Sequence, residues 1–167
     1  LSSGRCLGCF ASHDVDIYVS PRFRESACAA LCSLQFVPKS SNSLIEQVKT
    51  EFDYFGPEIQ GFGINIMWRP LSRVKLPFEV YLDDKIVWKN ISRLEATHIV
   101  LPDHDLLMYL CLLHISVHSF ARQPGIRLYL DIANLVHVPI DWQRIISWSR
   151  HDGTFTRVMA ALKIAQK

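Results

Sequence analysis

The sequence predicts an α+β fold, a small mixed sheet with helices followed by a helical C-terminal subdomain. Two segments with the alternation of a β-strand, residues 13–19 and 61–68, lie in the first half of the chain, with helical spacing between them. From residue 102 onward the apolar residues repeat with helical spacing only. Strands first and helices afterwards is the order of α+β proteins. We therefore expect an α/β domain over residues 1–101 and a helical subdomain over residues 102–167.

The composition is that of a folded protein with a substantial core. The 167 residues suit one ordinary domain, or a small α/β domain with a helical extension, and 49% of them are hydrophobic. The net charge is only +2 and the basic residues are scattered, so nucleic acid is not an expected partner. No apolar stretch has the length of a membrane span and no secretion signal is visible. With an odd number of cysteines, five, these features predict a cytoplasmic protein without a membrane partner.

The first strand carries the most distinctive polar residues. β-Branched and aromatic residues dominate residues 13–19, and Ser20-Pro21 ends the strand. Alternation places Asp14, Asp16 and Tyr18 on one face and Val15, Ile17 and Val19 on the other, which we expect to pack under helices. The two carboxylates then lie roughly 7 Å apart. Oxygen ligands on a rigid strand suit Mg²⁺, although an edge strand with two solvated aspartates fits the same pattern.

The remaining elements of the first domain follow from their end signals and spacing. Ser20 and Pro21 open a helix predicted to reach Leu34, and an extended segment follows at 36–38. Residues 44–55 are predicted to form a short helix that gives way to a strand near Glu51. In the strand at 61–68, one face carries Phe62, Ile64, Ile66 and Trp68, and the other Gly63, Asn65 and Met67.

The second half is predicted to be mainly helical. A weak helix or a loop covers residues 77–88, and a hairpin joins 91–94 to 98–101. Pro102-Asp103 opens a helix, a second spans about 126–136, Asp141 caps a third that ends at Gly153, and a fourth runs from Thr154 to Lys167. The residues expected to face inward are Leu106, Leu107, Leu110, Leu113, Val117, Leu128, Ile132, Leu135, Trp142, Ile145, Ile146 and Trp148.

Cysteine and histidine pairs offer weaker metal-binding hypotheses. Cys6 and Cys9 have the spacing of half a zinc knuckle or of a redox pair, and Cys28 and Cys32 lie one helical turn apart. The second pair lies in an alanine-rich helix, where cysteine usually acts as a small apolar residue. His114 and His118 also share a helix face, which is typical of packing at an interface as well as of metal binding.

Several of these segments together resemble a known family, the uncharacterised nucleotidyltransferases of bacteria within the polymerase-beta-like superfamily. The segments are Asp14–Val19, Leu34–Phe36, Asn65–Trp68, Leu101–Leu107 continuing through His114 to His118, Ile126–Ala133 and Ile140–Trp142. The resemblance covers most of the chain, and its helical part is the more specific. It implies a nucleotidyltransferase-like sheet and transfer of a nucleotidyl group from a nucleoside triphosphate to a hydroxyl acceptor.

The resemblance also implies roles for individual residues. Asp14 and Asp16 would hold Mg²⁺ and the triphosphate, and the turn at Ser3-Gly4 would stand for the superfamily's phosphate-binding Gly-Ser turn in reversed order. Arg127 would contact phosphate, although Arg127 and Asp131 lie one turn apart and also suit a surface ion pair.

Asn65 departs from the family pattern. The superfamily carries its third carboxylate there, and an amide cannot accept a proton from the attacking hydroxyl. Position 67 is methionine where the family tends to have histidine. Either another acid substitutes, with Asp53 and Glu51 as candidates, or the chain is a catalytically impaired relative that binds a nucleotide or a protein.

Overall fold

The structure is a computed structural model that describes residues 14–38, 51–56, 63–68, 84–95, 97, 99–117 and 125–166. Two units emerge from the contacts within the chain, Leu1–Trp68 and Arg69–Lys167. The first unit consists of strands and helix, and the second unit is mainly helical. The predicted α+β class with a helical C-terminal part is therefore confirmed. The predicted domain boundary after residue 101 stays a prediction.

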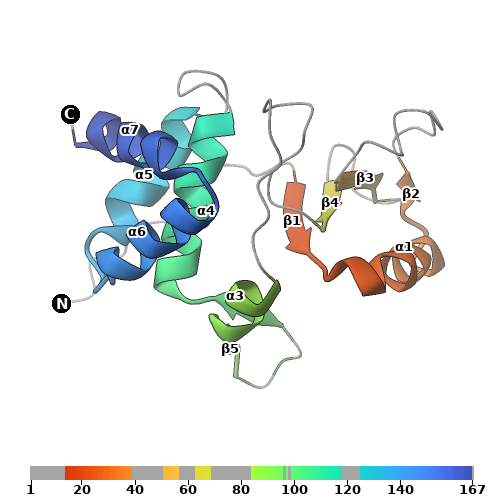
Figure 1. Cartoon of the computed structure of the whole chain (residues 1–167). Coiled ribbons are helices and arrows are strands. Elements are labelled where there is room, and N and C mark those ends of the chain that lie inside the picture. The colour runs from red at the N-terminus through yellow and green to blue at the C-terminus, as the bar shows by residue number, and fades with distance from the viewer. Residues whose placement is uncertain are drawn as a thin grey trace. The chain divides into compact units, whose positions relative to one another are not determined.

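A mixed sheet of four strands forms the first unit (Figure 1). The strands are, in spatial order, β1 (Asp14–Tyr18), β4 (Gly63–Met67), β3 (Glu51–Phe55) and β2 (Val37–Pro38). β1 runs parallel to β4, and the other neighbours are antiparallel. The strands predicted at 13–19, 61–68 and from Glu51 are confirmed, as is the extended segment at 36–38. The helix expected before Glu51 lies outside the described residues.

One helix covers one face of this sheet. A 3₁₀ turn, η1 (Pro21–Phe23), leads into α1 (Arg24–Ser33), which confirms the helix predicted from Pro21. The core beneath it consists of Leu31, Tyr54, Ile66 and Trp68, with Val19, Ala27, Cys28, Phe36 and Ile64 packed around them. The predicted apolar face of β4 is therefore the buried one. The opposite face, on which Asn65 lies, is left free of α1.

The apolar side of β1 is less buried than expected. Register places Val15 beside Ile64 and Ile17 beside Ile66, so both positions share the face that α1 covers. Their exposed fractions are nevertheless 45% and 38%, which corrects the expectation that this face packs fully under helices. β1 lies at one edge of this sheet, and the buried core residues of the strands, Tyr54 and Ile66, belong to β3 and β4.

A short helix and a hairpin begin the described part of the second unit. For residues 77–88 the sequence left a weak helix and a loop as alternatives. The last residues of this segment are helical, in α3 (Asp84–Lys89). β5 (Ile91–Arg93) pairs antiparallel with β6 (Val100–Pro102), which confirms the predicted hairpin. The backbone N–H of Asp103 donates to the carbonyl of Asn90 at 2.7 Å, so the two ends of the hairpin are tied together.

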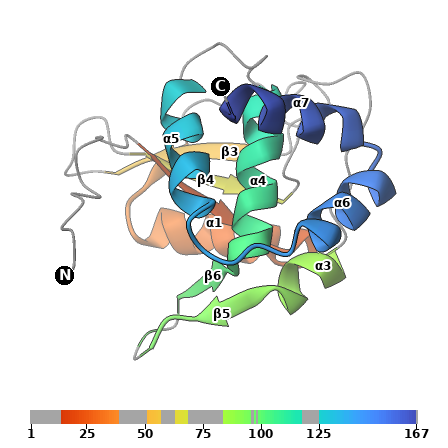
Figure 2. The ribbon, with the colours of Figure 1, turned by 90° about the vertical axis from the view of Figure 1, so that its left-hand side faces the viewer.

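Four helices complete the unit, and α4 lies among the other three (Figure 2). They are α4 (His104–Val117), α5 (Gly125–Leu135), α6 (Trp142–His151) and α7 (Phe155–Ala165). The buried residues of α4 include Leu106, Met108, Tyr109, Leu112, Leu113 and Ile115. Among the described residues, no helix is long and apolar enough to cross a membrane.

Two predicted inward positions are wrong. Leu107 and Trp142 are 36% and 37% exposed. Because α4 is apolar nearly all round, its periodicity could not decide which face is covered, and Trp142 occupies the first turn of α6. The predicted ends of α6 are correct: the Asp141 carboxylate accepts the N–H groups of Gln143 and Arg144, and Gly153 follows with φ of +70°. The last helix ends at Ala165, short of the predicted Lys167.

Candidate functional site

The strand register aligns three polar positions on the face of the sheet opposite α1. Asp16 of β1 is the register partner of Asn65 in β4, and Asn65 is the partner of Asp53 in β3. Neighbouring strands lie about 4.8 Å apart, and register partners share a face. Asn65 therefore lies between two acidic positions, in a row that crosses three strands.

The rows on either side add further positions to this face. On one side the row is Asp14, Gly63 and Phe55, and on the other it is Tyr18, Met67 and Glu51. Gly63 contributes no side chain at the position next to Asp14. The acidic positions 14, 16, 51 and 53 thus belong to one surface of the sheet, which we call the acidic face.

A side-chain contact within the central row joins Asn65 to Asp16. The Nδ2 group of Asn65 donates a hydrogen bond to Oδ1 of Asp16 at 3.1 Å. Asn65 Oδ1 is buried and accepts no hydrogen bond from the described residues. A buried acceptor without a donor costs about 1–3 kcal/mol, so this oxygen is suited to an added partner.

The donor types on the acidic face fit Mg²⁺. The carboxylate of Asp16 and the amide oxygen of Asn65 are both oxygen ligands of the kind that this ion takes. The described side chains include no group of three histidine, cysteine, aspartate or glutamate residues that could hold a metal by themselves. Positions 14 and 53 join the face through the backbone register. The residues present therefore fit a metal ion shared with a substrate phosphate.

The other predicted site residues are not brought to this face by any described contact. Ser3 and Gly4 lie outside the described residues. Arg127 belongs to α5 in the second unit, and its side chain is not among those described, so both alternatives for Arg127 stay open.

The metal hypotheses based on cysteine and histidine also stay predictions. Cys28 and Cys32 are free thiols on α1, the first half-buried and the second exposed. Cys6, Cys9 and His118 lie outside the described residues.

Sequence analysis overlooked a polar network in the second unit. Arg144 of α6 donates to Asp105 Oδ2 at 2.5 Å, contacts Asp103 Oδ2 at 3.5 Å and also donates to the Asn90 side chain. Asp105 accepts a further bond from the backbone N–H of Asp141 at 2.8 Å. The partners lie 36 to 54 residues apart, so no local pattern announces them. The one available signal was the acidic pair Asp103 and Asp105. Acidic residues are common at the start of a helix, because they interact favourably with the helix dipole, so this pair did not point to a distant partner.

A comparison with protein families matches one family over nearly the whole chain. The model of the uncharacterised nucleotidyltransferases covers residues 10–167, which includes both the acidic face and the helical unit. No curated protein and no solved structure matches the chain. The match confirms the resemblance drawn from the segments around Asp14, Leu101 and Ile126. The chain therefore belongs to the uncharacterised nucleotidyltransferase family.

Proposed function

We propose that this nucleotidyltransferase moves a nucleotidyl group from a nucleoside triphosphate to a hydroxyl acceptor in a reaction that depends on Mg²⁺ at the acidic face. The observation that carries the proposal is the register row of Asp16, Asn65 and Asp53, with Asp14 in the adjoining row. Like charges on neighbouring positions repel, and a divalent cation offsets that repulsion. Bound there, Mg²⁺ orients the phosphates and offsets the negative charge that develops during transfer.

In the proposed reaction the acceptor oxygen attacks the α-phosphorus of the triphosphate. The new bond joins that oxygen to phosphorus, the bond from phosphorus to the bridging oxygen of the β-phosphate breaks, and pyrophosphate leaves with its electron pair. The hydroxyl proton passes to a base on the protein. Asp14 and Asp16 are assigned to the metal, and Asn65 holds the Asp16 carboxylate through its amide.

The base is assigned to Asp53. Asn65 is neutral and has no site for the proton, whereas Asp53 is an acidic residue and is the register partner of Asn65 on the neighbouring strand. Glu51 lies in the next row and is paired in register with Met67, so it is farther from Asp16 along the sheet. The contacts of Ser3, Gly4 and Arg127 with phosphate stay predictions from the family resemblance.

A second candidate function is nucleotide binding without transfer. The hydrogen bond from Asn65 to Asp16 favours this second function. By the family resemblance, position 65 would carry the third carboxylate, but the Asn65 amide cannot accept a proton from the acceptor hydroxyl and brings no charge to a metal ion. Both functions require the metal and the triphosphate at the same face, and they differ only in turnover.

Binding and turnover can be measured separately on the full chain. Calorimetric titration with a non-hydrolysable ATP analogue, with and without MgCl₂, tests the site, and α-labelled ATP incubated with a fractionated cell extract tests transfer. We expect Mg²⁺-dependent binding that Asp16→Asn weakens at least tenfold. Absence of Mg²⁺-dependent binding in the unchanged protein would overturn both functions.

Matched variants then assign the roles. Asp53→Asn is expected to keep the binding of the Mg²⁺–nucleotide complex while it loses transfer, because the amide retains an oxygen ligand but accepts no proton. Glu25→Gln on the exposed start of α1 removes one carboxylate of the same unit and should change neither. Binding by the unchanged chain with no transfer to any fraction would favour the second function.

A further inference from the structure

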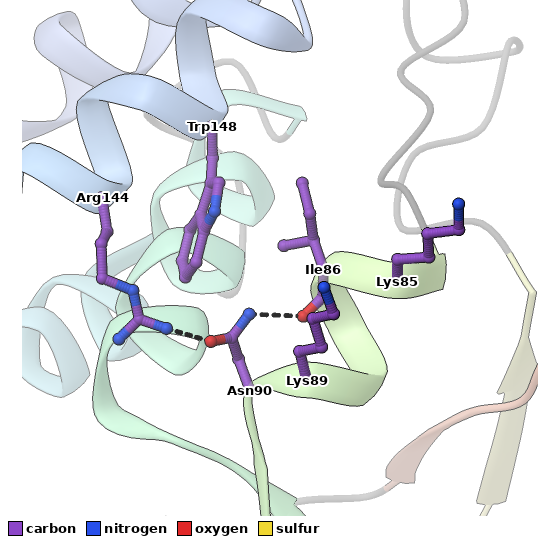
Figure 3. Close-up of a pocket in the computed structure, with 6 residues that line it drawn as sticks. All are labelled: Lys85, Ile86, Lys89, Asn90, Arg144 and Trp148. Atoms are coloured by element: carbon purple, nitrogen blue, oxygen red, sulfur yellow. Dashed lines mark hydrogen bonds between the residues drawn. The ribbon is translucent and has the colours of Figure 1, made fainter.

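A cavity of about 360 Å³ lies in the second unit between α3 and α6, well apart in sequence from the acidic face. Its lining is Lys85, Ile86, Lys89, Asn90, Arg144 and Trp148 (Figure 3). Three of the six are cationic, and no carboxylate lines it. The volume lies at the lower end of small-molecule sites, so it is large enough for more than a single anion.

Arg144 is held in a fixed position at one wall of the cavity. Its guanidinium lies 5.0 Å from the centre of the Trp148 ring, and Asp105 and Asn90 each accept one of its N–H groups. With the longer contact to Asp103, the described partners use three of the five N–H donors of a guanidinium. Two of the five N–H donors therefore have no hydrogen-bond partner given by these contacts.

Lys89 supplies a second cation from the opposite wall. Its side chain lies beside Ile86, across the cavity from Trp148 (Figure 3). Lys89 is exposed and has no carboxylate partner among the described residues, so its charge is available to a ligand. Lys85 lies at the far end of the same helix face, and its ammonium group is turned away from Arg144 (Figure 3).

The charge and shape of the cavity favour one class of ligand. Asp103 and Asp105 offset part of the charge of the three cations, which leaves a net positive site. Lysine acts as a point charge for phosphate and arginine as a directional donor, so a cavity lined by lysine from one helix and arginine from another suits a phosphate dianion. Ile86 and the Trp148 ring add apolar surface for an attached organic group.

We infer that this cavity binds the phosphate group of a small organic phosphate, with the organic part against Ile86 and Trp148. All of its lining residues belong to the second unit, and the binding proposed here requires no metal. Neither the family match nor the acidic face assigns it.

The test titrates the full chain with phenyl phosphate, inorganic phosphate and benzoate at fixed ionic strength in the presence of EDTA. Binding is followed by calorimetry and by amide NMR shifts. We expect phenyl phosphate to bind more tightly than inorganic phosphate and to shift the amides of Ile86 to Asn90 and of Ile145 to Trp148. Equal or tighter binding of benzoate would show a carboxylate site and overturn the assignment, as would the absence of binding.

Variants separate this site from general charge effects and from the acidic face. Lys89→Gln is expected to weaken phenyl phosphate binding about tenfold, as befits one charge-assisted contact, whereas Lys163→Gln on exposed α7 should leave it unchanged. Asp16→Asn should also leave it unchanged. Equal weakening by Lys163→Gln, or loss of binding in Asp16→Asn, would overturn the proposal. Both lysines are exposed, so neither change is expected to disturb folding.

Discussion

Asn65 donates a hydrogen bond to the carboxylate of Asp16, 49 residues earlier in the chain, at 3.1 Å across the parallel pair of β1 and β4. This contact places a neutral amide at the position where the sequence resemblance led us to expect an acid. The amide gives the Asp16 carboxylate a hydrogen-bond donor and adds no second negative charge beside it. The oxygen of the same amide, Oδ1, is buried and accepts no hydrogen bond from the described residues.

Asn65→Asp should make the stability of the protein depend on magnesium. A second carboxylate beside Asp16 replaces the donated bond with like-charge repulsion, so we expect about 1–2 kcal/mol less stability in EDTA at neutral pH. Added MgCl₂ should restore most of this loss, because the cation binds the folded site in preference to the unfolded chain. Urea denaturation with and without MgCl₂ measures both effects. Asn134→Asp, on an exposed position of α5, adds the same charge and should show no restoration by magnesium.

Local sequence patterns were sufficient to locate most elements of the fold. Alternation at Gly63–Met67 and Glu51–Phe55 and the cap at Asp141 each act within a few residues, so they can be read without tertiary information. Patterning failed where the element was apolar on all sides. Leu107 is the example, because only the packing of other helices against α4 decides which part of α4 stays exposed.

The candidate site was only partly predictable for the same reason. Alternation along one strand identified Asp14 and Asp16 as neighbours on a face, and the family pattern singled out Asn65. The sequence left Asp53 and Glu51 as equal substitutes, since the register between β3 and β4 is set by tertiary pairing. That register makes Asp53 the immediate neighbour of Asn65. The network around Arg144 was missed altogether because its partners are distant in sequence.

Asp105→Asn should destabilise the second unit. Asp105 is 7% exposed and accepts both the Arg144 guanidinium and the backbone N–H of Asp141. Loss of its charge weakens both bonds and leaves the cation without its nearer carboxylate, which we expect to cost about 2 kcal/mol after allowance for solvent around Arg144. Urea denaturation of the full chain, followed by far-UV circular dichroism, measures the change.

Asp103→Asn is the control for that prediction. Asp103 contacts Arg144 only at 3.5 Å, and its amide replacement keeps the oxygen that caps the Leu106 N–H at 2.8 Å. We therefore expect a cost below about 1 kcal/mol. Equal destabilisation by the two variants would show that Arg144 does not depend on Asp105 in the way described.

Tyr109→Phe should alter how stability responds to high pH. The Tyr109 hydroxyl is buried and bonds to Asp152 at 3.0 Å and to Thr154 at 2.9 Å. Burial, with the nearby charge of Asp152, raises the pKa of Tyr109 well above its ordinary value of 10.0. The folded state therefore keeps the proton after the unfolded chain has lost it, so this contribution is complete below pH 10 and is lost as the pH rises further.

The expected stability difference between the unchanged protein and Tyr109→Phe is about 1–2 kcal/mol at pH 7, the value of a buried hydrogen bond. It should shrink as the pH rises from 9 to 11, because only the unchanged protein loses the tyrosine contribution. Urea denaturation at a series of pH values measures the difference. A difference that stays constant over this range would contradict the pKa assignment.

Cys111 should be protected from alkylation despite being a free thiol. Burial in α4, with the charge of Asp131 as a smaller cause, raises the pKa of Cys111 to about 12, from an ordinary value of 9.0. At pH 8 it therefore holds about a thousandfold less thiolate than an ordinary cysteine, and thiolate is the reactive form. Iodoacetamide labelling with peptide mass spectrometry should modify exposed Cys32 before Cys111. In urea the labelling rates of Cys32 and Cys111 should converge, because unfolding removes the desolvation.

Asp131→Asn is the control for the Cys111 prediction. Labelling of Cys111 should stay slow in this variant, since burial is the larger cause of its raised pKa. Fast labelling of Cys111 in the folded chain would show that α4 is not packed as described.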